Sequence, residues 1–142
     1  MDGLTSVGSQ PPAGRKVGIL PCSGACNVGM MTTRAVVEIS SERPDVSFVC
    51  ALGLPLGIPG IIENAKKADY YLALNGCEVR CATKSLEKAG IKWDKELILT
   101  RDLGLPKNKN LKDGERLSDV IRIVNAAAFA GSYPKDCKTR GF

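Results

Sequence analysis

Apolar positions follow two alternating patterns along the chain, short continuous runs and longer segments with helical spacing. The short runs are rich in Val, Ile and Leu and predict buried strands. They lie at 16–20, 45–49, 70–74 and 96–100. The longer segments repeat apolar residues at three- and four-residue intervals and predict amphipathic helices. They lie at 28–41, 61–68, 82–89 and 117–129.

This alternation of strand and helix predicts an α/β fold in a single domain. We expect a mainly parallel four-stranded sheet with flanking helices, a three-layer arrangement of the Rossmann-like or flavodoxin-like kind. Residues 16–142 are expected to form the domain, because a chain of this size can bury its own core. Residues 1–15 are rich in Gly, Ser and Pro and are expected to be a flexible tail.

Composition and charge narrow the classes of function. The 142 residues are 44% apolar and 25% charged, an ordinary globular mixture with a mild net charge of +5. The lysines lie apart without interleaved aromatic residues, and those from Lys107 to Lys112 are expected to be solvated, which argues against nucleic-acid binding. No apolar stretch is long enough to span a membrane and the N-terminus does not resemble a secretory signal, which favours a cytoplasmic protein.

The chain contains no histidine, which excludes Ser-His-Asp and Cys-His catalysis and any site rich in histidine. It does contain six cysteines, five of them close to the ends of predicted strands. These five are Cys22, Cys26, Cys50, Cys77 and Cys81. In a reducing compartment such thiols are metal ligands or catalytic groups more often than disulfides. Cys137 stands outside the pattern and is expected to be an incidental exposed thiol.

Four of these cysteines predict a metal site. Cys22, Cys50 and Cys77 each come just after a strand, and the ends of parallel strands meet at one edge of a sheet. The spacing of Cys77 and Cys81 puts both on one face of a helix. Four sulfurs at one edge match an all-cysteine tetrahedral zinc site. Iron-sulfur ligation is chemically possible, but the usual ferredoxin spacings are absent.

Other functions of the same thiols stay open. Cys22 with Cys26, or Cys77 with Cys81, forms a pair suited to thiol-redox or sulfur-transfer chemistry. Cys50 alone is also compatible with a small buried hydrophobic residue. The turn CSGACNVG before a helix resembles an anion cradle, although Val28 stands where a cysteine phosphatase needs arginine.

Three segments together resemble the DGC-domain family, whose members are proposed to bind zinc. They are PCSGACNVGMMTTRAVVEIS, VCALGLPLGIPGIIENAKKADYYLALNGCEVRCATKSLEKAGI and LTRDLGLPKNKN, and the resemblance covers about residues 16–125. It implies that the zinc ligands are Cys22, Cys50, Cys77 and Cys81. The Asp of the family's Asp-Gly-Cys motif is Asn75 here, so an amide must take over its role or that role is lost. Cys26 is an extra thiol that could replace a ligand or pair with Cys22.

Overall fold

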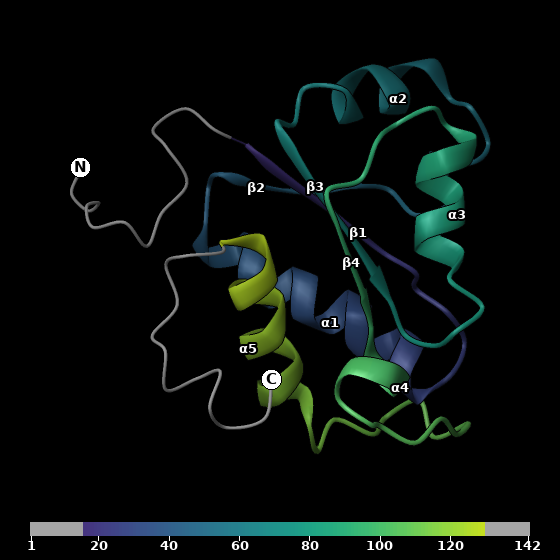
Figure 1. Cartoon of the computed structure of the whole chain (residues 1–142), viewed down its shortest axis with the longest axis vertical. Helices are drawn as coiled ribbons and strands as arrows, with labels where there is room; N and C mark the ends of the chain where they lie inside the picture. Colours follow the sequence, from purple (N-terminus) through teal and green to yellow (C-terminus); the bar gives the residue numbers. More distant parts are fainter. Residues whose placement is uncertain (1–15, 130–142) are drawn as a thin grey trace.

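A computed structural model describes residues 16–129, so the predicted tail 1–15 and Cys137 lie outside the described residues. Strands and helices alternate along the described chain as predicted (Figure 1). The strands are β1 (Val17–Pro21), β2 (Val46–Phe48), β3 (Tyr70–Asn75) and β4 (Lys95–Ile98). The helices are α1 (Asn27–Glu42), α2 (Pro59–Ala65), α3 (Cys81–Lys88), α4 (Leu99–Asp102) and α5 (Leu117–Ala128).

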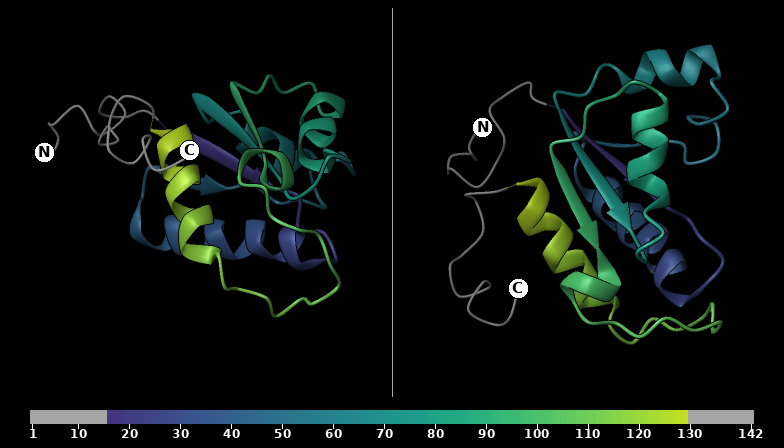
Figure 2. Two further views of the ribbon diagram at one scale, coloured as in Figure 1. Left: turned by 60° about the horizontal axis from the view of Figure 1, so that its bottom comes forward. Right: turned by 45° about the vertical axis from the view of Figure 1, so that its right-hand side comes forward.

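The four strands form one parallel sheet in the order β2-β1-β3-β4. Side chains alternate across the two central strands, as they must in an extended chain. Ile19 and Leu72 pack with α1 and α5 on one face, whereas Leu20 and Ala73 pack with α2 and α3 on the other. Figures 1 and 2 show these helices on opposite sides of the sheet. The predicted three-layer α/β fold is therefore confirmed.

One element differs from the prediction. The strand expected at 96–100 ends at Ile98, and the chain turns at once into the short helix α4. The Asp102 carboxylate accepts a hydrogen bond of 2.8 Å from the Ile98 amide, which holds the chain in this turn. Residues 97–99 are buried both at the end of β4 and at the start of α4, so the apolar run extends beyond the strand.

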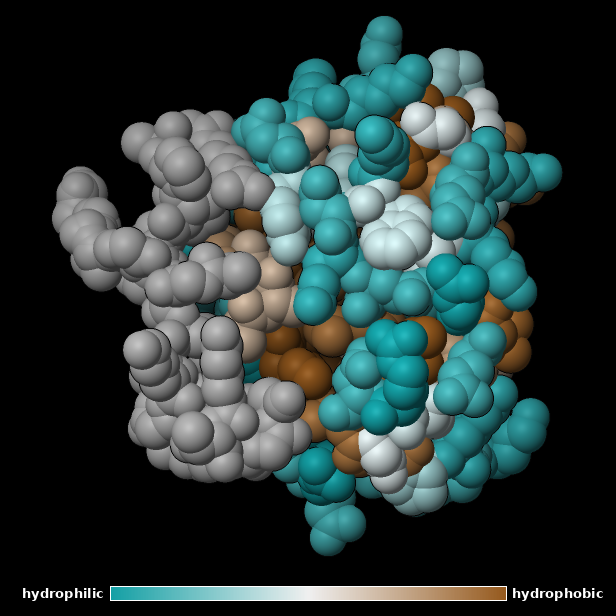
Figure 3. Space-filling model, in the orientation of Figure 1, coloured by the Kyte–Doolittle hydropathy of each residue, from teal (hydrophilic) through white to brown (hydrophobic). Residues whose placement is uncertain are grey.

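The surface is mainly hydrophilic on the face drawn in Figure 3, with hydrophobic residues visible between the polar ones. Between residues 16 and 129, every helix is too short or too polar to cross a lipid bilayer.

Candidate functional site

The carboxyl edge of the sheet carries three of the predicted metal ligands. Strands β2, β1 and β3 are neighbours, and Cys50, Cys22 and Cys77 follow them in that order along the edge. The Cys22 amide continues the pairing of β1 with β3 by donating to the Leu74 carbonyl at 3.0 Å. The three strands that precede these cysteines therefore lie side by side.

The turn that carries Cys77 lies against the start of α1. A Cβ atom on Gly76 would lie 2.8 Å from the backbone nitrogen of Gly29, closer than any side chain allows, so this position requires glycine. The residue before α1 is Cys26, whose side chain is buried in the core cluster that includes α1. Close backbone packing thus brings Cys77 and the first turn of α1 to the same place.

Three sulfur atoms at this edge accept hydrogen bonds from nitrogen. The Gly76 amide donates to the sulfur of Cys22 at 3.4 Å, and the Gly53 amide donates to the sulfur of Cys50 at 3.3 Å. The Lys107 ammonium donates to the sulfur of Cys77 at 3.4 Å. Cysteine binds metal and acts as a nucleophile as the thiolate, and a thiolate accepts hydrogen bonds from N–H donors such as these.

Lys107 reaches Cys77 because its loop is fastened to α1. The Asn27 side chain donates to the Pro106 carbonyl and accepts from the Asn108 amide, both at 2.7 Å. The hydrogen bond to Cys77 and the negative charge of thiolates at Cys77, Cys26 and Cys22 raise the pKa of Lys107. No pattern in the sequence indicates this contact, which differs from the solvated lysine predicted at this position.

Cys81 lies differently from the prediction. Helix α3 begins at Cys81, and Cys77 belongs to the preceding turn, which the Arg80 amide closes by donating to the Cys77 carbonyl at 3.2 Å. Arg80 has a left-handed backbone, with φ of 62°. The expectation that Cys77 and Cys81 share one helical face is therefore wrong, because the helix does not include Cys77.

The four predicted ligands are not gathered around one point. Within residues 16–129, no three Cys, Asp or Glu side chains are close enough together to hold one ion. Cys22 and Cys77 are partly buried, whereas Cys50 and Cys81 are exposed, so Cys50 is not a small buried hydrophobic residue. A cavity of about 310 Å³ opens beside Cys50, between β2 and α2. The set of four thiolates suits zinc by its chemistry, and its joint ligation remains a prediction.

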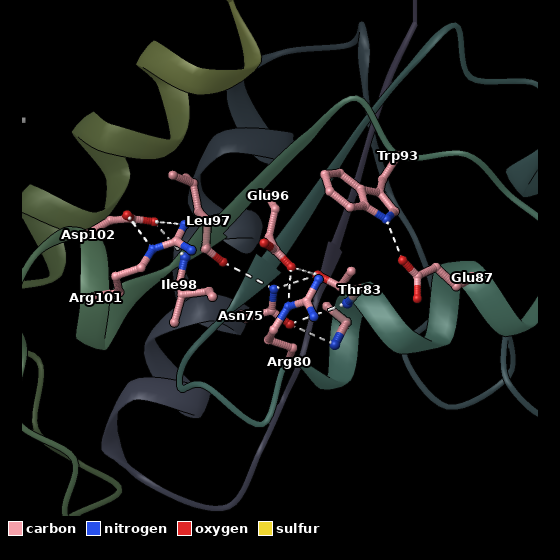
Figure 4. A network of polar contacts seen from close by, with 11 residues as sticks. Asn75, Arg80, Thr83, Glu87, Trp93, Glu96, Leu97, Ile98, Arg101 and Asp102 are labelled. Atoms are coloured by element: carbon pink, nitrogen blue, oxygen red, sulfur yellow. Dashed lines mark hydrogen bonds and ion pairs between the residues drawn. The ribbon is translucent and has the colours of Figure 1, made fainter.

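Asn75, at the motif position of the aspartate, is completely buried and uses its amide within the fold (Figure 4). Its side-chain oxygen accepts hydrogen bonds from the amides of Ala82 and Thr83, at 2.9 and 3.3 Å. Its nitrogen donates to the Thr83 hydroxyl at 2.8 Å and to the Leu97 carbonyl at 3.2 Å. Asn75 therefore caps the first turn of α3 and ties it to β4.

The same network continues to an ion pair (Figure 4). One oxygen of Glu96 accepts 2.6 Å hydrogen bonds from the Thr83 hydroxyl and from Arg80. Burial alone would raise the pKa of Glu96, but the hydrogen bonds from Thr83 and Arg80 and the charge of Arg80 together lower it. This pair holds Arg80, the residue before Cys81, against β4.

Comparison with known proteins places the chain in a family. The model of the DGC domain matches residues 18–126, which is most of the chain. Searches of curated proteins and of solved structures found no match. The chain belongs to the DGC-domain family, as its motifs predicted.

Proposed function

We propose that this DGC-domain protein binds one thiophilic metal ion, zinc in the first place, through Cys22, Cys50, Cys77 and Cys81. The observation that carries the proposal is the setting of three of these sulfurs. Each accepts a hydrogen bond from an N–H group at the carboxyl edge of neighbouring strands. Zinc binds sulfur in its deprotonated form, and that form accepts hydrogen bonds of this kind.

The donor set favours zinc over harder metals. Thiolate ligands select zinc, copper(I) or iron-sulfur clusters, whereas magnesium and calcium prefer oxygen. Closing a site of four sulfurs requires Cys50 and Cys81 to approach Cys22 and Cys77. An ion held by four cysteines has no open position, so its role would be structural, storage or sensing. We expect the protein to work in the cytoplasm, where its thiols stay reduced.

Elemental analysis of protein purified anaerobically and without chelator tests this proposal. We expect about one zinc ion per chain, the number that a single site of four thiolates holds. Cys77→Ser should remove the ion, and Cys137→Ser is the control that should retain it. Wild-type protein that contains no metal under these conditions would overturn the proposal.

Thiol-redox chemistry is the second candidate, and the contact between Lys107 and Cys77 favours it. The Lys107 ammonium donates a hydrogen bond to the Cys77 sulfur, and Cys81 follows four residues later as an exposed thiol. The Cys77 thiolate would attack a disulfide substrate, and Cys81 would then displace the substrate thiol, so two protein thiols are oxidised as the substrate is reduced. Oxidised glutathione should then convert metal-free protein into a defined Cys77–Cys81 disulfide, which peptide mass spectrometry detects. Random or absent pairing would rule this candidate out.

A further inference from the structure

We infer that Lys107 is the charge-compensating residue of the cysteine site and that Asn27 positions it. This inference rests on the proposed function, because it concerns the charge that four thiolates leave around a divalent ion. It assigns a role to the loop that follows α4, which supplies none of the predicted ligands.

Lys107 places a positive charge beside the sulfur of Cys77. Its ammonium donates to that sulfur at 3.4 Å across a sequence separation of 30 residues. One exposed lysine of the loop after α4 therefore contacts a thiol in the turn after β3.

Asn27 fixes the stretch of loop from which Lys107 extends. Its side chain bonds to the residues on both sides, Pro106 and Asn108, at 2.7 Å each. Its own amide donates to the Asn108 carbonyl at 2.9 Å. Asn27 is almost fully buried, so these bonds are shielded from water. Lys107 is thus held at both neighbouring residues, and only its side chain is left to move.

The charge of the site explains why a lysine belongs there. Four thiolates around one divalent ion carry a net charge of roughly −2, which a site in protein must offset with donors or cations. The Gly76 and Gly53 amides supply partial charges to Cys22 and Cys50. Lys107 supplies a full charge at Cys77, before metal binding and after it, because an ammonium can donate to a coordinated sulfur as well as to a free one.

Alkylation of Cys77 with two reagents tests the inference without metal. Iodoacetate is anionic and iodoacetamide is neutral, and both react with the same thiolate. The ratio of the iodoacetate rate to the iodoacetamide rate therefore reports the local charge, whatever fraction of the thiol is ionised. Lys107→Met should lower this ratio at Cys77 roughly two- to fivefold, the range of an exposed ion pair. Lys107→Arg should retain the ratio. Added salt should lower the ratio in wild-type protein and in Lys107→Arg, which carry the cation, and not in Lys107→Met.

Variants of Asn27 and Lys109 distinguish the positioning of Lys107 from the general effect of removing a lysine from this loop. Asn27→Ala should lower the ratio part of the way, because Lys107 loses its anchor and not its charge. If Asn27→Ala fails to fold, Asn27→Asp serves instead, since it keeps the acceptor for the Asn108 amide. Lys109→Met removes another exposed lysine of the same loop and should leave the ratio unchanged. An unchanged ratio in Lys107→Met would overturn the inference.

Chelator competition then measures zinc affinity in the same proteins. Lys107→Met should weaken zinc binding roughly two- to fivefold, and Lys107→Arg should restore it. If wild-type protein binds no zinc while Lys107→Met still lowers the alkylation ratio, the proposed function is refuted and Lys107 remains the counterion of Cys77. Wild-type protein that binds zinc with the same affinity as Lys107→Met would refute the role of Lys107 alone.

Discussion

The four predicted ligands fall into two pairs that the fold supports differently. The inner thiols, Cys22 and Cys77, are partly buried and follow the two central strands β1 and β3. The outer thiols, Cys50 and Cys81, are exposed. Cys50 comes shortly after the three-residue edge strand β2, and Cys81 is the first residue of α3. The sheet therefore fixes the inner pair, whereas local loop structure decides where the outer pair lies.

Serine substitutions at the two pairs should have the largest effect. Cys22→Ser should abolish zinc retention, because the inner thiols are the rigid part of the site. Cys50→Ser should leave a weaker site that loses its ion faster to a chelator, because water can replace an exposed ligand. Time courses of zinc release measure the difference. Equal loss in both variants would show that the two pairs do not differ in function.

Asn75→Asp tests the link between inner and outer thiols. Asn75 closes the turn that runs from Cys77 to Cys81, and it uses both donors of its amide. An aspartate would lose these donors and face the Leu97 carbonyl, so we expect the free energy of unfolding to fall by about 1–3 kcal/mol. Urea unfolding measures the change. Exposed Asn64→Asp is the control, with an expected change within about 0.5 kcal/mol.

The same variant decides what the motif position does. If Asn75 acted beside the metal, aspartate would increase zinc retention under chelator challenge. Because Asn75 bonds to α3 and β4 and not to a sulfur, we expect retention to stay the same or fall with stability. Tighter retention in Asn75→Asp would contradict the capping role.

Thiol labelling of metal-free protein should distinguish the pairs by rate. Cys50 and Cys81 should react several-fold faster with iodoacetamide than Cys22, because their side chains are exposed. Peptide mass spectrometry after short reaction times gives each rate. Zinc should slow the outer thiols as strongly as the inner ones if all four bind the ion. Outer thiols that react at the same rate with and without zinc would remove Cys50 and Cys81 from the ligand set.

Glu96 should give a small dependence of stability on pH. Thr83 and Arg80 lower the pKa of Glu96 from the ordinary 4.5, so at pH values above 4.5 the ionised side chain stabilises the fold. This contribution is lost as the pH falls through the lowered pKa. Glu96→Gln should lose it near neutral pH and show a flatter decline in stability on acidification. Urea unfolding at several pH values checks this, and an unchanged slope would mean that the ion pair contributes nothing.

The sequence was a sound guide to the fold because burial leaves a periodic pattern. Continuous apolar runs marked β1 and β3, and four-residue spacing marked α1, so the position of Cys22 and Cys77 at one edge could be predicted. Helix α4 could not be predicted, because hydrogen bonds such as the one from the Ile98 amide to Asp102 hold its turn and leave no hydrophobic pattern.

Side-chain direction was harder to predict than position. The spacing of Cys77 and Cys81 indicated one helical face, but the left-handed backbone of Arg80 starts the helix later. The contact of Lys107 with Cys77 could not be predicted either, because it depends on the hydrogen bonds by which Asn27 holds a loop distant in the sequence. Sequence patterns locate residues on elements, and tertiary contacts between loops decide which of them meet.

X-ray absorption at the zinc edge of the purified protein tests the central claim most directly. A site formed by Cys22, Cys50, Cys77 and Cys81 predicts a first shell of sulfur alone, at about 2.3 Å from the ion. A shell that contains nitrogen or oxygen ligands in place of the outer thiols, or a protein that holds no metal, would contradict it.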